Sequence, residues 1–233
     1  EILSMPPVSS GGIAVIQMLN ILEGYDIRRS GLLSSETVHY MAEAMKRGYA
    51  DRSKWLGDPG FYKVPQAGMI TKDYAKKLRA SIDPDKSTDV EPGRPKGAKE
   101  SGDTTHFSVV DAAGNAVSCT TTINSSFGSG LVVDGLGFLL NNEMDDFSAK
   151  PGVPNQFGLV GGVANAIAPG KRMLSSMTPT IVVKDGKLRL VLGSPGGGRI
   201  ISTVLQVIMN VVDHELAVDV AVRTPRVHHQ WKP

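Results

Sequence analysis

The hydrophobic residues of this chain recur with a helical period at first and with an alternating period after Thr104. In the first stretch, Ile13, Ile16, Leu19 and Leu22 recur at helical spacing. Gly24 follows at a position where a helix commonly stops. We therefore predict a first helix that ends near Gly24.

Two further helices are predicted before the period changes. One runs from about Ser35 to Trp55, and its hydrophobic side carries Val38, Met41, Met45 and Tyr49. A shorter helix follows Thr71, whose hydroxyl can cap its first turn. The first part of the chain should therefore be mainly helical.

A polar segment separates the helical part from the alternating part. Residues 83–103 read "DPDKSTDVEPGRPKGAKESGD", which is rich in proline, glycine and charge and has almost nothing to bury. We expect this segment to be exposed and mobile.

After Thr104 the pattern predicts two hairpins and a helix. "THFSVV" and "NAVSCTTTIN" alternate as strands and are joined by "DAAGN". "TIVVKDGKLRLVLGSP" is a second hairpin, with Asp185 and Gly186 in its tight turn. "GGGRIISTVLQVIMNVV" opens with glycines and continues as a buried helix. Helices followed by strands and a further helix indicate an α+β fold.

The loop of the first hairpin fixes a register. If Asp111–Asn115 is a five-residue loop, Thr104 faces Thr122 and His106 faces Thr120, with Cβ atoms roughly 4.5–5.5 Å apart. Asn124 continues the same polar face. The opposite face should enter the core, and it carries Phe107, Val109, Val117 and Ile123.

Simpler interpretations of these polar residues remain open on the pattern alone. Threonine is a common strand residue, so hydroxyl pairs arise without any function. A serine-type triad is disfavoured because His106 and Thr104 are two residues apart on one strand, or roughly 6.6 Å. A metal site at His228 and His229 is also disfavoured, because adjacent residues on a strand point to opposite faces.

Composition narrows the class of protein. The 233 residues are 41% hydrophobic and 21% charged, which is ordinary for a soluble globular domain. A formal charge of +2 and the lack of a basic block with aromatics argue against nucleic acid as a partner. Cys119 is the single cysteine, so an intrachain disulfide is excluded. The chain starts without a methionine or a leader-like segment, and we expect a piece of a longer precursor.

Several separated motifs resemble the γ-glutamyltranspeptidase family, also called glutathione hydrolases. They are "MPPVSSGG", "YADRSKWLGDP", "TTHFSVVDAAGNAVSCTTTINSSFGSG", "LLNNEMDDFSAKPGVPN", "KRMLSSMTPTIVVKDGK", "GSPGGGRII" and "TPRVHHQW". The resemblance implies the four-layer αββα sandwich of N-terminal nucleophile hydrolases, present here in part. It also implies a self-cleaving precursor, with residues 1–103 ending the large subunit and residues 104–233 beginning the small catalytic subunit.

By this resemblance the precursor is cut between Asp103 and Thr104, and Thr104 becomes the nucleophile. A threonine hydroxyl is a weak nucleophile that needs an adjacent base. The freed α-amine of the same residue is such a base, because its ordinary pKa is about 7.7–8.0. Thr122 matches the family threonine that orients the nucleophile.

The resemblance also implies a substrate site. Asn124, Glu143 and Asp146 match positions that hold the substrate α-amino group, and several family members have glutamine in place of Glu143. Ser175 and Ser176 match the pair that binds the α-carboxylate, whereas the family's carboxylate-binding arginine lies upstream of this chain.

Gly196 and Gly197 match the backbone donors of the oxyanion hole in this family. The chemistry of the residues agrees, because glycines let the backbone approach a substrate closely. Amides at a helix start also favour developing negative charge. Without the resemblance, a plain strand-to-helix turn is an equally good interpretation.

The implied activity is γ-glutamyl transfer from glutathione and related compounds to water, amino acids or dipeptides. It implies a large/small subunit heterodimer, no metal or organic cofactor, and export, to the periplasm if the source is a Gram-negative bacterium. The alternatives are a cephalosporin (glutaryl) acylase or poly-γ-glutamate depolymerase on the same scaffold, or a non-catalytic fragment.

Overall fold

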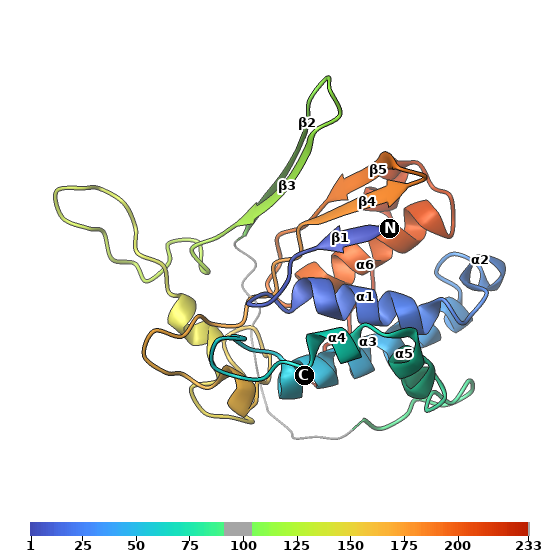
Figure 1. Cartoon of the computed structure of the whole chain (residues 1–233), viewed down its shortest axis with the longest axis horizontal. Helices are drawn as coiled ribbons and strands as arrows, with labels where there is room; N and C mark the ends of the chain where they lie inside the picture. The colour runs from blue at the N-terminus through green and yellow to red at the C-terminus, as the bar shows by residue number, and fades with distance from the viewer. Residues whose placement is uncertain (91–103, 233) are drawn as a thin grey trace.

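The computed structural model describes residues 1–90 and 104–232 as two small sheets with helices packed on one side (Figure 1). The helices are α1 (Gly11–Leu22), α2 (Ile27–Ser30), α3 (Ser35–Trp55), α4 (Gln66–Met69), α5 (Lys72–Arg79), α6 (Arg199–Val212) and α7 (Val218–Arg223). The strands are β1 (Ile2–Ser4), β2 (Thr105–Val110), β3 (Ala116–Thr121), β4 (Thr180–Lys184) and β5 (Lys187–Leu192), and 3₁₀ turns η1 and η2 lie at Glu143–Asp146 and Val163–Asn165.

The predicted helices are confirmed, and so is the predicted cap at Thr71, while Ser34 is a further cap. The Ser34 hydroxyl accepts a hydrogen bond from the amide of Thr37 at the start of α3 (3.1 Å), and Thr71 does the same for Tyr74 at the start of α5 (3.2 Å). α1 is buried on more sides than one face, because α3, α5, α6 and β1 all pack against it. Its Val15, buried completely, lies outside the predicted stripe.

The larger sheet has the order β1-β4-β5, and all its pairs are antiparallel. Asp185 and Gly186 both have positive φ, 51° and 72°, as the predicted tight hairpin turn between β4 and β5 requires. One side of the sheet rests on α1 and α6, and Val182 and Leu190 join the core there (Figure 1). The second predicted hairpin and the buried helix after it are thus confirmed.

The first hairpin has the predicted register, with His106 opposite Thr120 and Val110 opposite Ala116. The prediction for its apolar face is wrong. Phe107, Val109 and Val117 are 47%, 54% and 54% exposed. Instead of that face, the polar one lies against the larger sheet.

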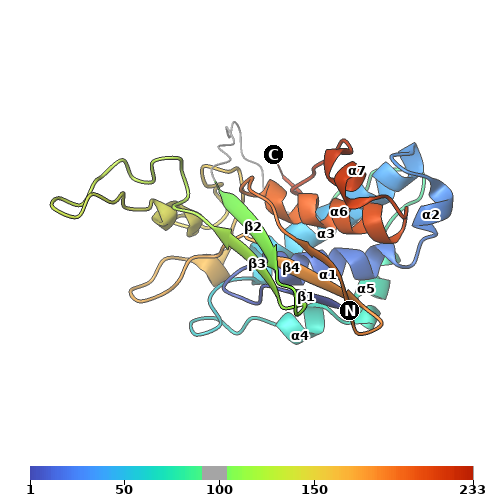
Figure 2. The ribbon, with the colours of Figure 1, turned by 90° about the horizontal axis from the view of Figure 1, so that it is seen from above.

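Two serines make that polar contact. Ser108 donates a hydrogen bond to the carbonyl of Val191 (3.2 Å), and Ser118 donates to the carbonyl of Leu192 (2.8 Å). Seen from above, the hairpin lies over the β1-β4-β5 sheet (Figure 2). A helix layer, a sheet and a second β layer therefore follow one another. These layers are part of the predicted αββα sandwich, and the fold is α+β.

The segment before Thr104 is held more firmly than its composition suggests. Over residues 83–90, the side chain of His39 contacts the carbonyl of Asp83 (2.8 Å), and the amide of Thr88 donates to Glu43 (3.2 Å). The indole of Trp231 donates to the carbonyl of Val90 (2.6 Å). The rest of the segment predicted to be mobile, residues 91–103, lies outside the described residues. Within the described ranges, no helix combines the length and apolarity needed to cross a bilayer.

Candidate active site

A narrow cavity collects most of the predicted site residues from segments far apart in the sequence. Its lining is Thr104, Thr122, Asn124, Asp146, Phe157, Leu159, Ser175, Ser176, Met177, Gly197 and Ile200. These residues come from the first hairpin, η1, the segment after it, the loop before β4 and the start of α6. The cavity therefore brings hydroxyls, a carboxylate, an amide and backbone donors to one place.

The two threonines at the hairpin end face each other across it. Thr104 precedes β2, Thr122 follows β3, and the Thr104 hydroxyl donates to the Thr122 hydroxyl oxygen at 3.4 Å. This distance is at the long end for a hydrogen bond between hydroxyls. The Thr122 oxygen also accepts from the amide of Asn124 (2.9 Å), which fixes the chain direction after the strand.

Asn124 is buried and linked to the turn that carries the carboxylates. Its side-chain amide donates to the carbonyl of Asn142 (3.3 Å), while the amide of Ser125 donates to the Asn142 side chain (2.9 Å). Asn124 has a φ of 77°, a conformation that asparagine tolerates better than most residues. The predicted polar face of the hairpin therefore extends to Asn124, which contacts the residue before the η1 turn.

Asp146 is the carboxylate that lines the cavity. Burial raises its pKa to about 7, whereas the positive charge of Arg52 acts in the opposite direction. Glu143 and Asp145 raise that pKa further by repulsion. Glu143 begins the same turn but does not line the cavity, and burial raises its own pKa too.

Asn165, on η2, was not predicted as a site residue. Its side-chain nitrogen donates to the carbonyl of Asp146 (2.7 Å), and its side-chain oxygen accepts from the amide of Leu174 (3.0 Å). It therefore fixes the distance between the Asp146 turn and the Ser175–Ser176 segment. A lone asparagine in a glycine- and alanine-rich stretch gives no sequence signal for this contact.

Ser175 and Ser176 are held from behind by a buried polar group that the sequence also did not reveal. The Ser10 hydroxyl donates to the carbonyl of Ser175 (2.7 Å). Arg52, in the last turn of α3, donates from Nε to the Ser10 hydroxyl (2.9 Å) and from Nη2 to the Ser176 hydroxyl (3.0 Å). An arginine in an amphipathic helix is ordinarily taken for a surface residue, yet this side chain is 4% exposed.

The glycines before α6 complete the cavity. Gly196 and Gly197 have φ of +126° and +52°, which favour glycine, and Gly197 lines the cavity. In the described part of the chain, neither of their amide hydrogens has an acceptor. Tyr49 donates from its hydroxyl to the carbonyl of Gly198 (2.5 Å), the residue that caps α6. Gly197 lines the same cavity as Thr104, and backbone donors in such a position suit a developing oxyanion.

The gamma-glutamyltranspeptidase family model matches residues 1–233. The chain belongs to this family. It is 56% identical to the glutathione hydrolase proenzyme of Escherichia coli over 100% of the chain and 40% of that protein. The chain therefore spans about 40% of the length of that curated relative.

Solved structures agree with the γ-glutamyltranspeptidase assignment. The enzyme from Pseudomonas nitroreducens complexed with L-DON is 64% identical, with a TM-score of 0.53 over 54% of this chain and 65% of that chain. Cephalosporin acylase from Bacillus halodurans is 28% identical, with a TM-score of 0.80 over 97% of this chain and 38% of that chain.

His106 belongs to the same hairpin as Thr104 but contacts other groups. Its Nδ1 lies 2.8 Å from the Thr120 hydroxyl and its Nε2 lies 3.1 Å from the Ser108 hydroxyl. Burial lowers its pKa, and it does not line the cavity. His228 uses Nδ1 on the Ser202 hydroxyl (2.7 Å) and Nε2 on the Gln230 side chain (3.0 Å), and Nδ1 of His229 accepts from the amide of Trp231 (3.0 Å).

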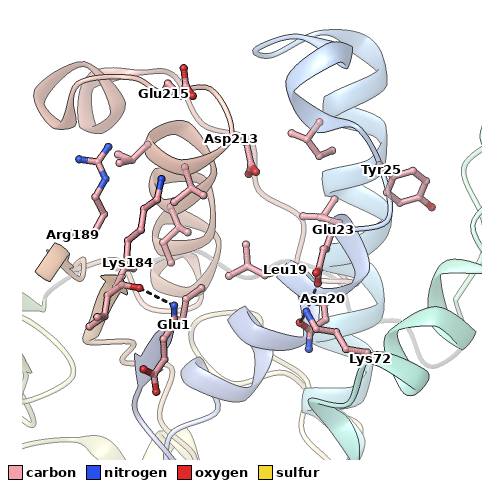
Figure 3. Close-up of a pocket in the computed structure, with 18 residues that line it drawn as sticks. Glu1, Leu19, Asn20, Glu23, Tyr25, Lys72, Lys184, Arg189, Asp213 and Glu215 are labelled. Carbon is pink, nitrogen blue, oxygen red and sulfur yellow. Dashed lines mark hydrogen bonds and ion pairs between the residues drawn. The ribbon is translucent and has the colours of Figure 1, made fainter. Parts of the chain in front are cut away.

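A larger cavity of about 670 Å³ lies elsewhere in this family member and contains none of the predicted site residues. It opens between α1 and α6, with Leu19 and Ile208 among its apolar walls (Figure 3). Its rim mixes acidic and basic residues, such as Glu23 and Lys72, which pair with each other. This cavity is the larger of the two, but the hydroxyls, carboxylate and backbone donors needed for acyl transfer line the one at Thr104.

Proposed function

We propose that the full-length protein containing this chain transfers γ-glutamyl groups from glutathione and other γ-glutamyl amides to water, amino acids or dipeptides. The supporting observation is the single cavity in which Thr104, Asp146, Ser176 and Gly197 meet. Its groups match the four needs of this reaction, which are a nucleophile, an ammonium site, a carboxylate site and oxyanion donors.

The proposed enzyme matures by hydrolysis of the peptide bond between Asp103 and Thr104. The carbonyl carbon of Asp103 takes up the oxygen of one water molecule, and the nitrogen of Thr104 becomes a free amine. Asp103 lies outside the described residues, so the support comes from Thr104, whose hydroxyl already faces the cavity and Thr122. Residues 1–103 would then end the large subunit, and residues 104–233 would begin the small one.

In the proposed reaction the Thr104 oxygen attacks the γ-carbonyl carbon, and its proton passes to the Thr104 amine. The carbonyl oxygen becomes an oxyanion that the amides of Gly196 and Gly197 stabilise, each donor typically contributing about 2.7–4 kcal/mol. The carbon–nitrogen bond breaks, the leaving amine takes the proton, and a γ-glutamyl ester of Thr104 remains. Water or an acceptor amine then attacks the ester and restores the threonine.

The free amino-acid end of the donor would lie at the other side of the cavity. Asp146 in its ionised form suits the α-ammonium, and the Asn124 side chain adds a polar contact to the same group. Ser175 and Ser176 would donate to the α-carboxylate. Glu143 begins the same η1 turn as Asp146 but does not line the cavity, so its contribution would be a longer-range charge.

N-terminal sequencing and intact mass of the full-length product test the maturation step. Two chains are expected, with Thr104 at the start of the second, and a Thr104→Ala variant should remain one chain. Any other new terminus would refute the assignment of the nucleophile. A single uncut and inactive chain would favour the non-catalytic alternative.

Comparison of two substrates tests the reaction class. The proposal expects turnover of γ-glutamyl-p-nitroanilide to exceed that of glutaryl-cephalosporin, because Asp146 and Asn124, which line the cavity, would contact an amino group that glutaryl substrates lack. The opposite preference would support an acylase, a class that includes the Bacillus halodurans structure of similar fold.

A further inference from the structure

Arg52 is a buried cation that forms no close ion pair among residues 1–90 and 104–232, although the charge of Asp146 acts on it from a longer distance. Its guanidinium is held by two hydroxyl oxygens, those of Ser10 at 2.9 Å and Ser176 at 3.0 Å. Other buried cations on α3 have a partner, since Lys46 and Arg47 both contact Glu43. A buried charge is unfavourable unless an opposite charge lies near, and Asp146 supplies such a charge only from a longer distance than Glu43 does for Lys46 and Arg47. A second anion beside Ser176 would therefore stabilise the Arg52 guanidinium further.

The hydrogen bond to Ser176 also fixes the direction in which that serine can act. A guanidinium carries donors only, so the Ser176 oxygen must accept from Nη2. The hydroxyl hydrogen of Ser176 is thereby left to point to another acceptor, and Ser176 lines the cavity. Arg52 thus makes Ser176 a donor toward whatever the cavity holds.

The same arginine orients the neighbouring loop. The Ser10 hydroxyl accepts from Arg52 Nε and donates to the carbonyl of Ser175 at 2.7 Å. Because both serines of the pair are tied to one planar group, their separation and direction are set together. Tyr49, one turn earlier on α3, fixes the start of α6 through Gly198. One helix face therefore supports two sides of the cavity.

We propose that Arg52 is a positioning residue for the α-carboxylate of the γ-glutamyl donor. It orients the Ser176 hydroxyl as a donor and supplies a positive charge behind it. This inference rests on the proposed function. It adds a cation that acts on the carboxylate through Ser176, from a position on α3 behind the cavity wall.

The test uses the full-length protein and three p-nitroanilides that share one leaving group. γ-Glutamyl-p-nitroanilide has both α-substituents, the glutaryl compound lacks the amine, and the 4-aminobutyryl compound lacks the carboxylate. For Arg52→Gln we expect kcat/KM to fall roughly 10–100-fold for the first two, mainly through KM. The 4-aminobutyryl compound has no carboxylate on which Arg52 and Ser176 could act. Its kcat/KM should therefore be less than about 3-fold lower for Arg52→Gln than for the wild type.

Arg47→Lys is the matched control, because Arg47 is another buried arginine of α3 and its contacts lie at Glu43, Leu78, Ser81 and Thr88. Its effect should be the same for all three substrates. Arg52→Lys retains the charge but cannot hold both serines, so its loss should lie between those of the wild type and Arg52→Gln.

An equal loss on all three substrates would overturn the proposal, because a purely structural arginine gives that result. The proposal also fails if neither Arg52 variant forms the cleaved enzyme while Arg47→Lys does. Wild-type protein that turns over none of the three substrates would instead refute the proposed function, and this inference with it. Selective loss on the two carboxylate-bearing substrates supports both.

Discussion

The hydroxyl of Thr104 donates to the hydroxyl oxygen of Thr122 across the open end of the β2–β3 hairpin, at 3.4 Å. Thr122 is one residue beyond the paired strand, and the amide of Asn124 holds its oxygen in place. The nucleophile proposed here is therefore oriented by its own cross-strand neighbour. The contact is long, and such contacts commonly tighten when the substrate is bound.

Replacing Thr122 tests whether this contact matters for chemistry. Thr122→Val keeps the shape but removes the hydroxyl, and we expect kcat to fall about 10–100-fold, the effect of losing one or two hydrogen bonds at a reacting group. Thr122→Ser should keep most of the turnover. Rates are to be measured with γ-glutamyl-p-nitroanilide after the extent of cleavage has been matched. Equal rates for Thr122→Val and Thr122→Ser would contradict an orienting hydroxyl.

Asp146 should control the acidic limb of the pH profile. Its pKa is about 7, and only the ionised form attracts the substrate ammonium. We expect kcat/KM to rise with pH through about 7, and the freed Thr104 amine should add a second ionisation near its ordinary value of about 7.7–8.0. Asp146→Asn should lower kcat/KM about 100-fold and leave a shallower limb from the amine alone. An unchanged slope in the variant would exclude Asp146 as the titrating group.

The same carboxylate should reduce stability at high pH. Its folded pKa is raised above the unfolded value of about 3.9, so its contribution is most favourable below that value and is lost as the pH rises through about 7. Asp146→Asn mimics the neutral form and should therefore stabilise the folded protein at pH 8 by about 1–3 kcal/mol. Urea unfolding at pH 4 and pH 8 measures this, and a variant less stable than wild type at pH 8 would contradict it.

His106 should prove dispensable for proton transfer. Its ring is engaged by Thr120 and Ser108, and burial lowers its pKa. His106→Ala should reduce turnover less than about 10-fold, through the packing of the hairpin on β5, whereas loss of a general base typically costs 10²–10⁴-fold. Complete loss of turnover in a folded and cleaved His106→Ala protein would revive a histidine mechanism.

The sequence predicted the register of the first hairpin because turn length and alternation are local properties. It therefore predicted that Thr104 and Thr122 meet. Its prediction of the buried face was wrong, because alternating apolar residues such as Phe107 and Val117 are typical of a face that packs in the core. Which face is buried depends on whether the neighbouring sheet presents polar or apolar groups to the hairpin. Here β5 presents backbone carbonyls that accept hydrogen bonds from Ser108 and Ser118.

The residues of the candidate site also fall into two groups, those that the sequence could identify and those that it could not. Residues that touch the cavity lie in motifs, so Ser175 and Gly197 could be named from resemblance. Arg52 and Asn165 act through other residues, and their partners are distant in sequence, Ser176 for Arg52 and Asp146 for Asn165. Helical periodicity places Arg52 correctly on α3 but does not predict which side chains pack against that turn of the helix. Such supports are visible only once the fold is known.

Glu43 should be the most sensitive carboxylate for stability. Burial alone would raise its pKa, but hydrogen bonds from Lys46, Thr88 and Arg47 hold it at about 2. Its contribution is therefore present above the ordinary glutamate value, about 4.3, and is lost as the pH falls toward 2. Glu43→Gln should destabilise the protein by about 3–5 kcal/mol at pH 7, because two buried cations lose their partner.

Glu36→Gln is the control for that measurement, since Glu36 lies exposed in the first turn of the same helix. It should change the free energy of unfolding by less than about 1 kcal/mol. Similar destabilisation by the two substitutions would show that the Glu43 cluster contributes no more than a surface charge.

The β2–β3 hairpin rests on the larger sheet through serine hydroxyls and leaves Phe107, Val109 and Val117 facing outward. Hydrogen bonds fix direction but supply little adhesion in water, whereas three neighbouring apolar side chains adhere to many surfaces without selectivity. A polypeptide of these residues alone should thus be prone to precipitate through this hairpin.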